Sequence, residues 1–222
     1  WIEGERQSIA FSGKSLLADW WYWSHRISEH QSELKRVNDR NTSKRLRKLY
    51  RKRKRRFRDA INTIVYRFVK LCFEKGVSEI IVGDVSHIRD NNDKGSKINS
   101  LIHNFWSFRY IIERLRTTAE NFVIKVSLVE EYRTSSVCPF CEAEGRRIKR
   151  GLFYCPECNQ VMNADVVGCL NIAKKLTIIP NPSWGRDNGV LTHPAVLKDC
   201  KPPRWESSPF RAGRRSNGMK SM

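Results

Sequence analysis

Four cysteines in two pairs constrain this chain more than any other feature of its sequence. Cys138 and Cys141 are separated by two residues, as are Cys155 and Cys158, and thirteen residues lie between the pairs. A pair with this spacing turns both sulfurs toward one point, and two pairs complete the tetrahedral four-sulfur shell that Zn²⁺ favours. A proline follows the first cysteine of each pair and helps to fix the turn. The pattern predicts a zinc ribbon over residues 134–160.

Two other interpretations of these cysteines are weaker. Two disulfides would require an oxidising compartment, and unliganded thiols at this spacing would be a coincidence. Four protein ligands fill the metal shell, which favours a structural zinc over a catalytic one. An odd number of cysteines remains outside the ribbon (Cys72, Cys169 and Cys200), as expected for a reducing cytoplasm.

The charge balance indicates a polyanionic partner. Lys and Arg total 42 against 23 acidic residues, a formal net charge of +19. Nucleic acid is the leading candidate, ahead of an anionic membrane surface. No apolar run approaches the roughly 20 residues that span a bilayer, and the first residues lack the layout of a signal peptide. We therefore expect a cytoplasmic protein without a membrane partner.

A helical hairpin is predicted over residues 14–75. Its first helix carries several tryptophans at helical spacing, among them Trp20 and Trp23. They can pack between two helices or stack on nucleic-acid bases, and helical spacing favours packing.

The second helix of the hairpin carries the densest charge in the protein. Between Lys44 and Arg58, eleven of fifteen residues are Lys or Arg, and an apolar stripe runs through them. This indicates an amphipathic helix with one buried face, not a disordered tail. The basic face can be merely solvated or can hold a phosphate backbone, and counterion release favours the phosphate. The expected nucleic-acid contacts are Lys48, Arg51, Lys52 and Arg55.

The remaining pattern predicts an α/β fold. Short strands are expected at residues 5–12, 79–85 and 123–129, and helices at 102–121 and 166–176. Beyond the last helix, Pro, Gly, Ser and Arg dominate without periodicity, so 177–222 is predicted to be a largely disordered basic tail.

Acidic residues stand at the ends of these elements. The candidates are Asp84, Glu130, Glu131 and Asp165. Phosphodiester cleavage with two Mg²⁺ ions needs several carboxylates around ions roughly 4 Å apart. Each acid has an ordinary alternative, because Asp165 could simply cap its helix and the two glutamates could face water.

The carboxyl-terminal motifs resemble those of a known family. The segments EEYRTSSVCPFC, CPEC and NADVVGCLNIAKK are similar to the corresponding part of TnpB proteins, the OrfB-type proteins of insertion sequences. The shared pattern is Thr134-Ser135 before the first cysteine pair, the second pair, and Asp165 six residues before Asn171-Ile172. The basic helix, IIVGDVSHIRD and HNFWSFRYIIERL extend the resemblance to about residues 10–175.

The resemblance implies a RuvC-like nuclease domain of RNase H fold, split by a zinc ribbon. It also implies a guide RNA, cleavage of DNA matched to that guide, and two Mg²⁺ ions held by three acids. The third acidic position maps onto Asp165. The second is usually a Glu before an Asp, where this chain has Gly83-Asp84. Some relatives instead carry that acid three residues before Thr-Ser, where this chain has Glu131.

We therefore expect Glu131 and Asp165 to be catalytic, with Glu130 in reserve and Asp84 less favoured. The first acidic position of the family lies in a strand with a pattern like GIDLG, which this sequence lacks. The chain then corresponds to a carboxyl-terminal portion, and a complementing amino-terminal polypeptide could supply the missing strand. We expect the isolated chain to cleave DNA poorly.

The resemblance divides the chain into four parts. These are an incomplete RuvC-like core segment over 1–133, the ribbon over 134–160, a final core helix over 161–176, and the tail over 177–222. Two alternatives to a nuclease remain open: a nuclease-inactive zinc protein that binds nucleic acid, and a decayed transposon remnant.

Overall fold

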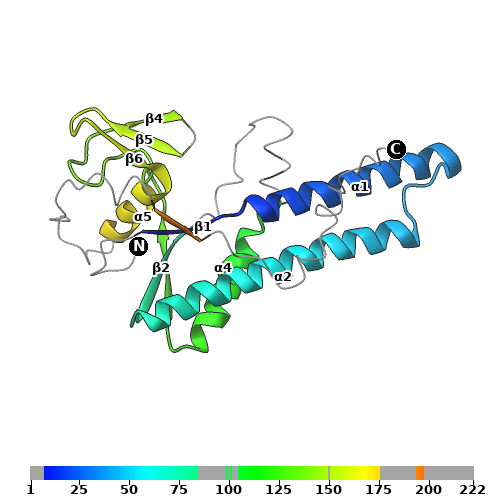
Figure 1. The fold of residues 1–222 in the computed structure, drawn as a ribbon, viewed down its shortest axis with the longest axis horizontal. Helices are drawn as coiled ribbons and strands as arrows, with labels where there is room; N and C mark the ends of the chain where they lie inside the picture. The colour runs from blue at the N-terminus through cyan, green and yellow to red at the C-terminus, as the bar shows by residue number, and fades with distance from the viewer. Residues whose placement is uncertain are drawn as a thin grey trace, which may run out of the picture. The chain divides into compact units, whose positions relative to one another are not determined.

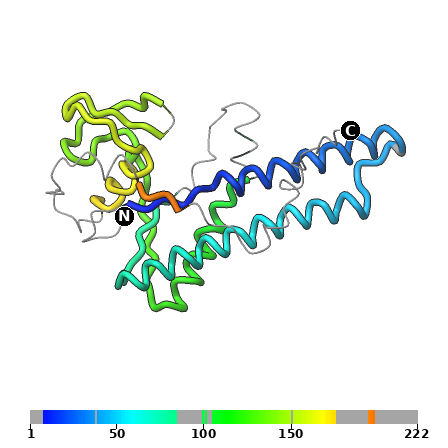
Figure 2. The backbone as a smooth tube through the Cα atoms, viewed as in Figure 1, coloured from blue at the N-terminus to red at the C-terminus, as the bar shows by residue number. Residues whose placement is uncertain are grey.

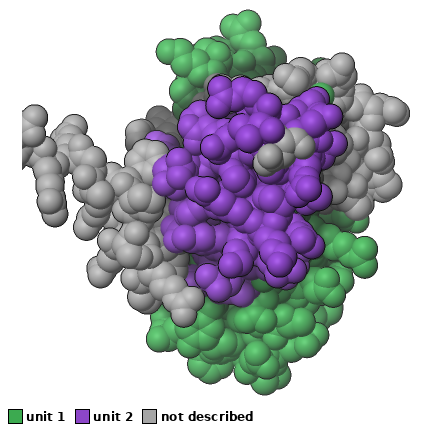
Figure 3. Space-filling model, turned by 90° about the vertical axis from the view of Figure 1, so that its right-hand side faces the viewer, with its two compact units in different colours: residues 1–13, 64–197 green, residues 14–63, 198–222 purple. Residues whose placement is uncertain are grey.

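The computed structural model describes residues 8–84, 99, 101, 105–149, 151–175 and 194–197. The chain divides into two compact units, which are considered separately below (Figure 3). One unit contains residues 14–63 and 198–222, and the other contains residues 1–13 and 64–197.

The described elements are helices and short strands (Figure 1). The helices are α1 (Lys14–Asn38), α2 (Lys44–Glu74), α4 (Phe108–Glu120) and α5 (Ala164–Lys175). The strands are β1 (Ile9–Phe11), β2 (Glu79–Asp84), β3 (Lys125–Glu130), β4 (Arg146–Lys149), β5 (Leu152–Cys155), β6 (Gln160–Asn163) and β7 (Ala195–Leu197). The expected α/β character is confirmed.

Helices α1 and α2 form the antiparallel hairpin that the sequence predicts (Figure 2). Successive contacts along α2 reach progressively earlier residues of α1: Ser43 meets His30, and Arg53 meets Ser24. Helix α2 begins after a polar turn because the Ser43 hydroxyl accepts a hydrogen bond from the Leu46 amide, at 3.0 Å.

Two tryptophans of α1, Trp20 and Trp23, belong to the core of the hairpin, as expected, whereas Trp21 is half-buried. Trp20 is 6% exposed and Trp23 is 7% exposed, so neither presents a free face to a base. The guanidinium of Arg53 lies 4.9 Å from the Trp20 ring centroid, and the Lys52 ammonium lies 4.5 Å from that of Trp23. Part of the basic side of α2 therefore packs against the aromatic core by cation–π contacts.

A buried ion pair also joins the two helices. Arg56 donates to both carboxylate oxygens of Asp19, at 2.8–3.2 Å, and the Asp19 side chain is only 7% exposed. A bidentate pair in this setting fixes geometry as well as charge. Arg56 therefore has an internal role, which the periodicity of the sequence does not reveal.

The other unit is built around two parallel strands, β2 and β3. Their register pairs Glu79 with Lys125 at one end and Asp84 with Glu130 at the other. Helix α4 packs on β3, and α5 packs on both strands. Parallel strands bring their carboxyl ends to one edge, so the acids after β3 lie beside the end of β2.

The boundaries of two elements differ from the prediction. Strand β3 starts two residues later than expected, because Phe122 and Ile124 both donate backbone hydrogen bonds to Ala119 and so form a turn after α4. Val123 is 92% exposed in that turn, with a φ of 57°. Helix α4 begins at Phe108, with Ser107 as its N-cap, and so starts later than the expected residue 102; residues 102–104 lie outside the described residues.

The segment expected to be disordered contains a short strand. Residues 195–197 pair in parallel with β1, and the Ala195 amide donates to the Ser8 carbonyl at 2.9 Å. The apolar run of these three residues can pair although the surrounding sequence has no periodicity. The rest of 177–222 lies outside the described residues. Among the described helices, none is both long and apolar enough to cross a membrane.

Candidate functional site

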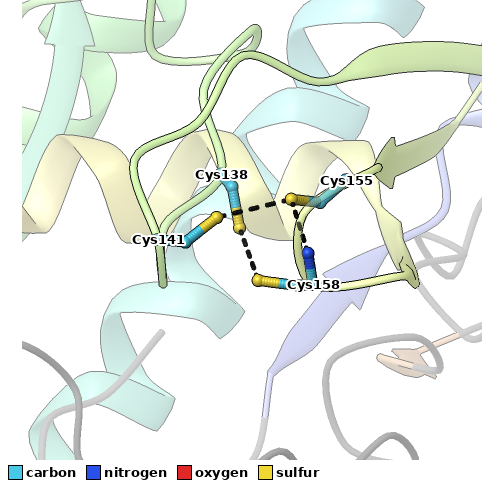
Figure 4. A group of neighbouring side chains, drawn as sticks. All are labelled: Cys138, Cys141, Cys155 and Cys158. Atoms are coloured by element: carbon cyan, nitrogen blue, oxygen red, sulfur yellow. Dashed lines mark hydrogen bonds between the residues drawn. The ribbon is translucent and has the colours of Figure 1, made fainter.

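The four cysteines converge (Figure 4). All four sulfur atoms lie within 4.8 Å of one another. The Sγ atoms of Cys138 and Cys158 are 3.9 Å apart, and those of Cys141 and Cys155 are 3.4 Å apart. Zn–S bonds of ~2.3 Å would put tetrahedral sulfurs roughly 3.8 Å apart. The spacing is much longer than a disulfide bond of ~2.05 Å and fits a shared metal ion.

Each cysteine pair forms a similar turn. The residue that follows the second cysteine of each pair has a left-handed backbone conformation, with a φ of 62° at Glu142 and 51° at Asn159. The Cys158 amide donates to the Cys155 sulfur at 3.4 Å. The antiparallel strands β4, β5 and β6 carry the second pair, and Phe153 fills the space beneath the cluster. The predicted convergence of the four cysteines is confirmed, and the cluster could hold a metal ion.

The chemistry of the cluster also favours a cation. Desolvation raises the pKa of the Cys138 thiol, and desolvation together with the neighbouring cysteines raises the pKa of Cys158. The pKa of Cys141 is lowered instead, because its desolvation is outweighed by hydrogen bonds from the Ala143 backbone and from the neighbouring cysteines. A negative charge on Cys138, in turn, disfavours the ionisation of Cys158. A bound dication would reverse that effect and stabilise the thiolates.

The second group of polar residues lies at the carboxyl ends of β2 and β3. The side chain of Glu131 lies directly against Gly83. A Cβ atom added at Gly83 would overlap the Glu131 carboxylate, 1.9 Å from Oε1 and 2.4 Å from Cγ. The volume that a side chain at position 83 would fill is therefore occupied by the glutamate of the next strand.

The surroundings of Glu131 perturb its ionisation. Desolvation and the negative charge of Asp84 raise the pKa of Glu131, and the Lys175 ammonium opposes this shift. Glu131 is half-buried, whereas Glu130 is exposed. Of the two adjacent glutamates, Glu131 has the more protected position and the charged neighbours.

Asp165 is not the cap of its helix. The Asn163 side chain caps α5, because its Oδ1 accepts from the amides of Asp165 at 2.9 Å and Val166 at 3.2 Å. Asp165 lies one position inside the helix with an exposed carboxylate. The interpretation of Asp165 as a simple N-cap is therefore wrong, and its carboxylate remains available to a ligand.

Glu131 and Asp165 share a neighbour in Cys169, one helical turn after Asp165. Desolvation is the main cause that raises the pKa of the Cys169 thiol, and the negative charges of both acids add to it. The charges of both carboxylates therefore influence the same thiol of α5. Among the described residues, no three acids lie as close together as the four cysteines do. The acids around Glu131 therefore offer fewer potential metal ligands than the cysteine cluster.

The basic candidates on α2 are exposed. Lys48, Arg51, Lys52 and Arg55 all present their side chains to solvent, whereas Arg53 and Arg56 are half-buried. We call the first four residues the basic face. Sequence reasoning found these residues but did not distinguish the two arginines that serve the core.

Two family descriptions match successive parts of the chain. Residues 2–89 match the OrfB_IS605 family, described as a probable transposase, and residues 108–172 match the Cas12f1-like TNB domain.

Individual proteins give the same result. The chain is 27% identical over 174 residues to a TnpB-like protein of Acidianus two-tailed virus, covering 75% of this chain and 37% of that protein. It is 31% identical over 102 residues to a TnpB-like protein of Aquifex aeolicus, covering 44% and 33%, respectively. A TnpB-like protein of Methanocaldococcus jannaschii is 31% identical over 97 residues, with 44% and 35% covered. The chain thus spans about a third of the length of these relatives.

Solved structures show a similar fold. A chain of a Cas12f1–sgRNA–target DNA complex superposes with a TM-score of 0.55 at 18% identity, covering 72% of this chain and 42% of that chain. A CRISPR–Cas12f ternary complex gives a TM-score of 0.56 at 17% identity, covering 72% and 33%. The convergent cysteines, the successive family matches and the TnpB-like relatives together support a TnpB/OrfB-type protein.

Proposed function

We propose that this chain carries the RuvC-like part of a transposon-associated, RNA-guided DNA endonuclease, with an RNase H-like arrangement of strands, working in a prokaryotic cytoplasm. Glu131 and Asp165 would be its catalytic acids. The observation that carries the proposal is the position of the Glu131 side chain against Gly83. In the family pattern an acid usually occupies position 83, and here the carboxylate of Glu131 takes that volume.

The two acids suit a hard divalent cation. Carboxylate oxygens are the ligands that Mg²⁺ prefers, and Asp165 and Glu131 both act on Cys169. Bound Mg²⁺ would stabilise the attacking and leaving oxygens of the phosphodiester. The fold would position the two carboxylates, with Glu131 held at the end of β3 and Asp165 in the first turn of α5.

The four-cysteine cluster would hold a structural Zn²⁺. All four ligands come from the protein, so no open position remains for a substrate. Because α5 packs on β5 and β6 of the ribbon and on β2 and β3, the zinc would also fix the helix that carries Asp165.

Guide RNA and target DNA are the proposed partners. The basic face offers four exposed cations on one helix, and phosphate contacts by such side chains release counterions. The similar Cas12f1 structure is a complex with sgRNA and target DNA, which supports the same classes of partner here. A complementing amino-terminal polypeptide is a further proposed partner.

A second candidate function is nucleic-acid binding without cleavage. It is favoured by the absence, among the described residues, of a third acid close enough to complete a cluster. The two functions differ in what the acids do: a nuclease needs them to bind divalent ions, whereas a binding protein does not.

Exchanging the acid between positions 83 and 131 tests the proposal. Glu131→Ala should weaken Mn²⁺ binding by at least ~10-fold, because ion ligands are lost from a site with few of them. The double variant Gly83→Glu with Glu131→Gly should regain part of that affinity, since it returns a carboxylate to the same volume. Binding is measured by electron paramagnetic resonance, and Mg²⁺-dependent DNA cleavage is measured with guide RNA and the complementing polypeptide present.

Glu130→Ala is the matched control, because it removes the same charge one residue away and should leave Mn²⁺ binding unchanged. Asp165→Ala should behave like Glu131→Ala. Wild-type affinity in both the Glu131 and the Asp165 variants would contradict the nuclease proposal and leave nucleic-acid binding as the better one.

A further inference from the structure

Three consecutive carbonyl groups around Glu131 are held by side chains. The Lys175 ammonium donates to the carbonyls of Glu130 and Tyr132, at 2.9 Å each. The carbonyl of Glu131 itself accepts from the Thr134 hydroxyl at 3.0 Å and from the Thr134 amide at 3.2 Å. These hydrogen bonds therefore hold the backbone on both sides of Glu131, although Glu131 itself lies beyond the end of β3.

A second connection runs from α5, the helix that contains Lys175, to the residues after Tyr132. The Asn171 amide nitrogen donates to the carbonyls of Thr134 at 2.7 Å and Val137 at 2.8 Å. Val137 immediately precedes the first metal-cluster cysteine. Asn171 therefore links α5 to the whole segment between Glu131 and Cys138.

Both donors belong to the helix that carries Asp165. Asp165, Asn171 and Lys175 all lie within the twelve residues of α5. A helix is a rigid support, so contacts six and ten residues after Asp165 fix the distance between that acid and the bound segment. Strand β3 and its pairing with β2 end at Glu130, so the strand register does not extend to Glu131.

We propose that Asn171 and Lys175 are positioning residues, which hold the backbone of Glu131 against α5 and so set the relative placement of the two acids. This rests on the proposed nuclease function. Displacement of a reacting group by ~1 Å can reduce a rate by 100-fold, so such contacts matter although neither residue touches the ion. The proposal also gives a physical role to Thr134 and Asn171, which the family pattern contains.

The alternative is that these contacts only stabilise the fold. Thr134 is 5% exposed, so its removal would disturb packing and would not discriminate between the two roles. Lys175 is the better probe, because its side chain lies at the surface and its ammonium makes both of the contacts that the proposal invokes. Arginine can still donate to two carbonyls, whereas methionine retains the apolar stem and donates nothing.

The experiment compares Lys175→Met, Lys175→Arg and Asn171→Ala in the full chain, with Mn²⁺ as the probe. We expect Lys175→Met and Asn171→Ala to weaken Mn²⁺ binding ~10-fold, the usual size of an effect exerted through a ligand's supporting contacts. Lys175→Arg should restore most of the affinity. Zinc content and thermal unfolding are measured on every variant and should remain at wild-type values for both Lys175 variants.

Lys174→Met is the matched control. Its ammonium lies 3.4 Å from the Glu142 carboxylate beside the cysteine cluster, not against the strand end, so Mn²⁺ affinity should stay at the wild-type value. Wild-type Mn²⁺ affinity in Lys175→Met and Asn171→Ala, with binding lost in Glu131→Ala, would overturn the positioning roles alone. Wild-type affinity in Glu131→Ala and Asp165→Ala would overturn the nuclease proposal and this one with it.

Discussion

The hairpin of residues 14–63 and the unit of residues 64–197 use their charged side chains in opposite ways. In the hairpin, the basic face consists of neighbours on one turn after another of α2, and each side chain is independently exposed. In the other unit, Glu131 follows β3 and its side chain lies against Gly83 of β2, while α5, which carries Asp165, packs on both strands. The first arrangement is local, and the second is assembled.

This difference predicts different sensitivities to mutation. When charges are removed from such a basic face, the binding free energy should fall in proportion to their number, because each phosphate contact contributes through counterion release. An assembled site depends on the contacts that bring its parts together, so single changes far along the chain can abolish it. Three predictions, in order of decreasing effect, test this comparison.

The largest effect is expected from removing one ligand of the cysteine cluster. Cys155→Ser should lower zinc content to near zero and loosen residues 136–163, because a structural zinc contributes ~10 kcal/mol of folding free energy to so small a module. Metal analysis and hydrogen exchange measure both effects. Protection of the hairpin should be unchanged, since its core of Trp20, Trp23 and their neighbours contains no metal ligand.

Cys169→Ser is the matched control for this substitution. Cys169 lies outside the four-sulfur cluster, so its replacement should leave one zinc per chain. Full zinc occupancy in Cys155→Ser would show that the four cysteines do not form the site.

The next effect concerns nucleic-acid affinity. Reversing Lys48, Arg51 and Arg55 to Glu should reduce affinity for RNA or DNA by ~10³-fold at low salt and flatten its salt dependence. Lys52 is left unchanged because its ammonium also lies over the Trp23 ring. Affinity is measured as a function of salt concentration by fluorescence anisotropy.

Reversal of Arg109, Arg114 and Arg116 on α4 is the control, with the same change in net charge on three exposed arginines. Its effect should be clearly smaller. Equal losses from the two triple variants would mean that net charge governs binding and that the basic face has no special role.

The smallest effect is a pH-dependent change in stability at Glu131. Its pKa is raised by desolvation and by Asp84, so the folded state holds the proton more tightly than the unfolded state. Stability from this group is therefore greatest at low pH and falls as pH rises from the unfolded pKa through the folded pKa. Glu131→Gln should slightly raise the Tm at neutral pH, and the difference from wild type should vanish below about pH 4.

Glu130→Gln provides the comparison, because that side chain is exposed. A Tm for Glu131→Gln below that of wild type at neutral pH would reverse the sign argued here. It would mean that the ionised carboxylate stabilises the fold.

Local features could be predicted from the sequence with little loss. The cysteine spacing predicted the cluster, and the hairpin prediction placed a second helix where α2 is found. Ser43 caps the start of α2, and Gly76, with a φ of 70°, lies just beyond its end. The predicted start of β3 was less accurate, because residues around Val123 form a turn after α4 instead of extending the strand. The assignment of Glu131 depended on a family resemblance, since its position beside Gly83 involves residues 48 positions apart.

The sequence by itself determined the metal-binding motif, the hairpin and the excess of positive charge, because each depends on residues close together in the chain. Only the tertiary structure decided which arginines of α2 serve the core. It also decided which residue caps α5, and which side chains fix the backbone around Glu131. Those outcomes depend on contacts between distant segments, and no spacing or periodicity encodes whether a carbonyl at 130 will meet an ammonium at 175.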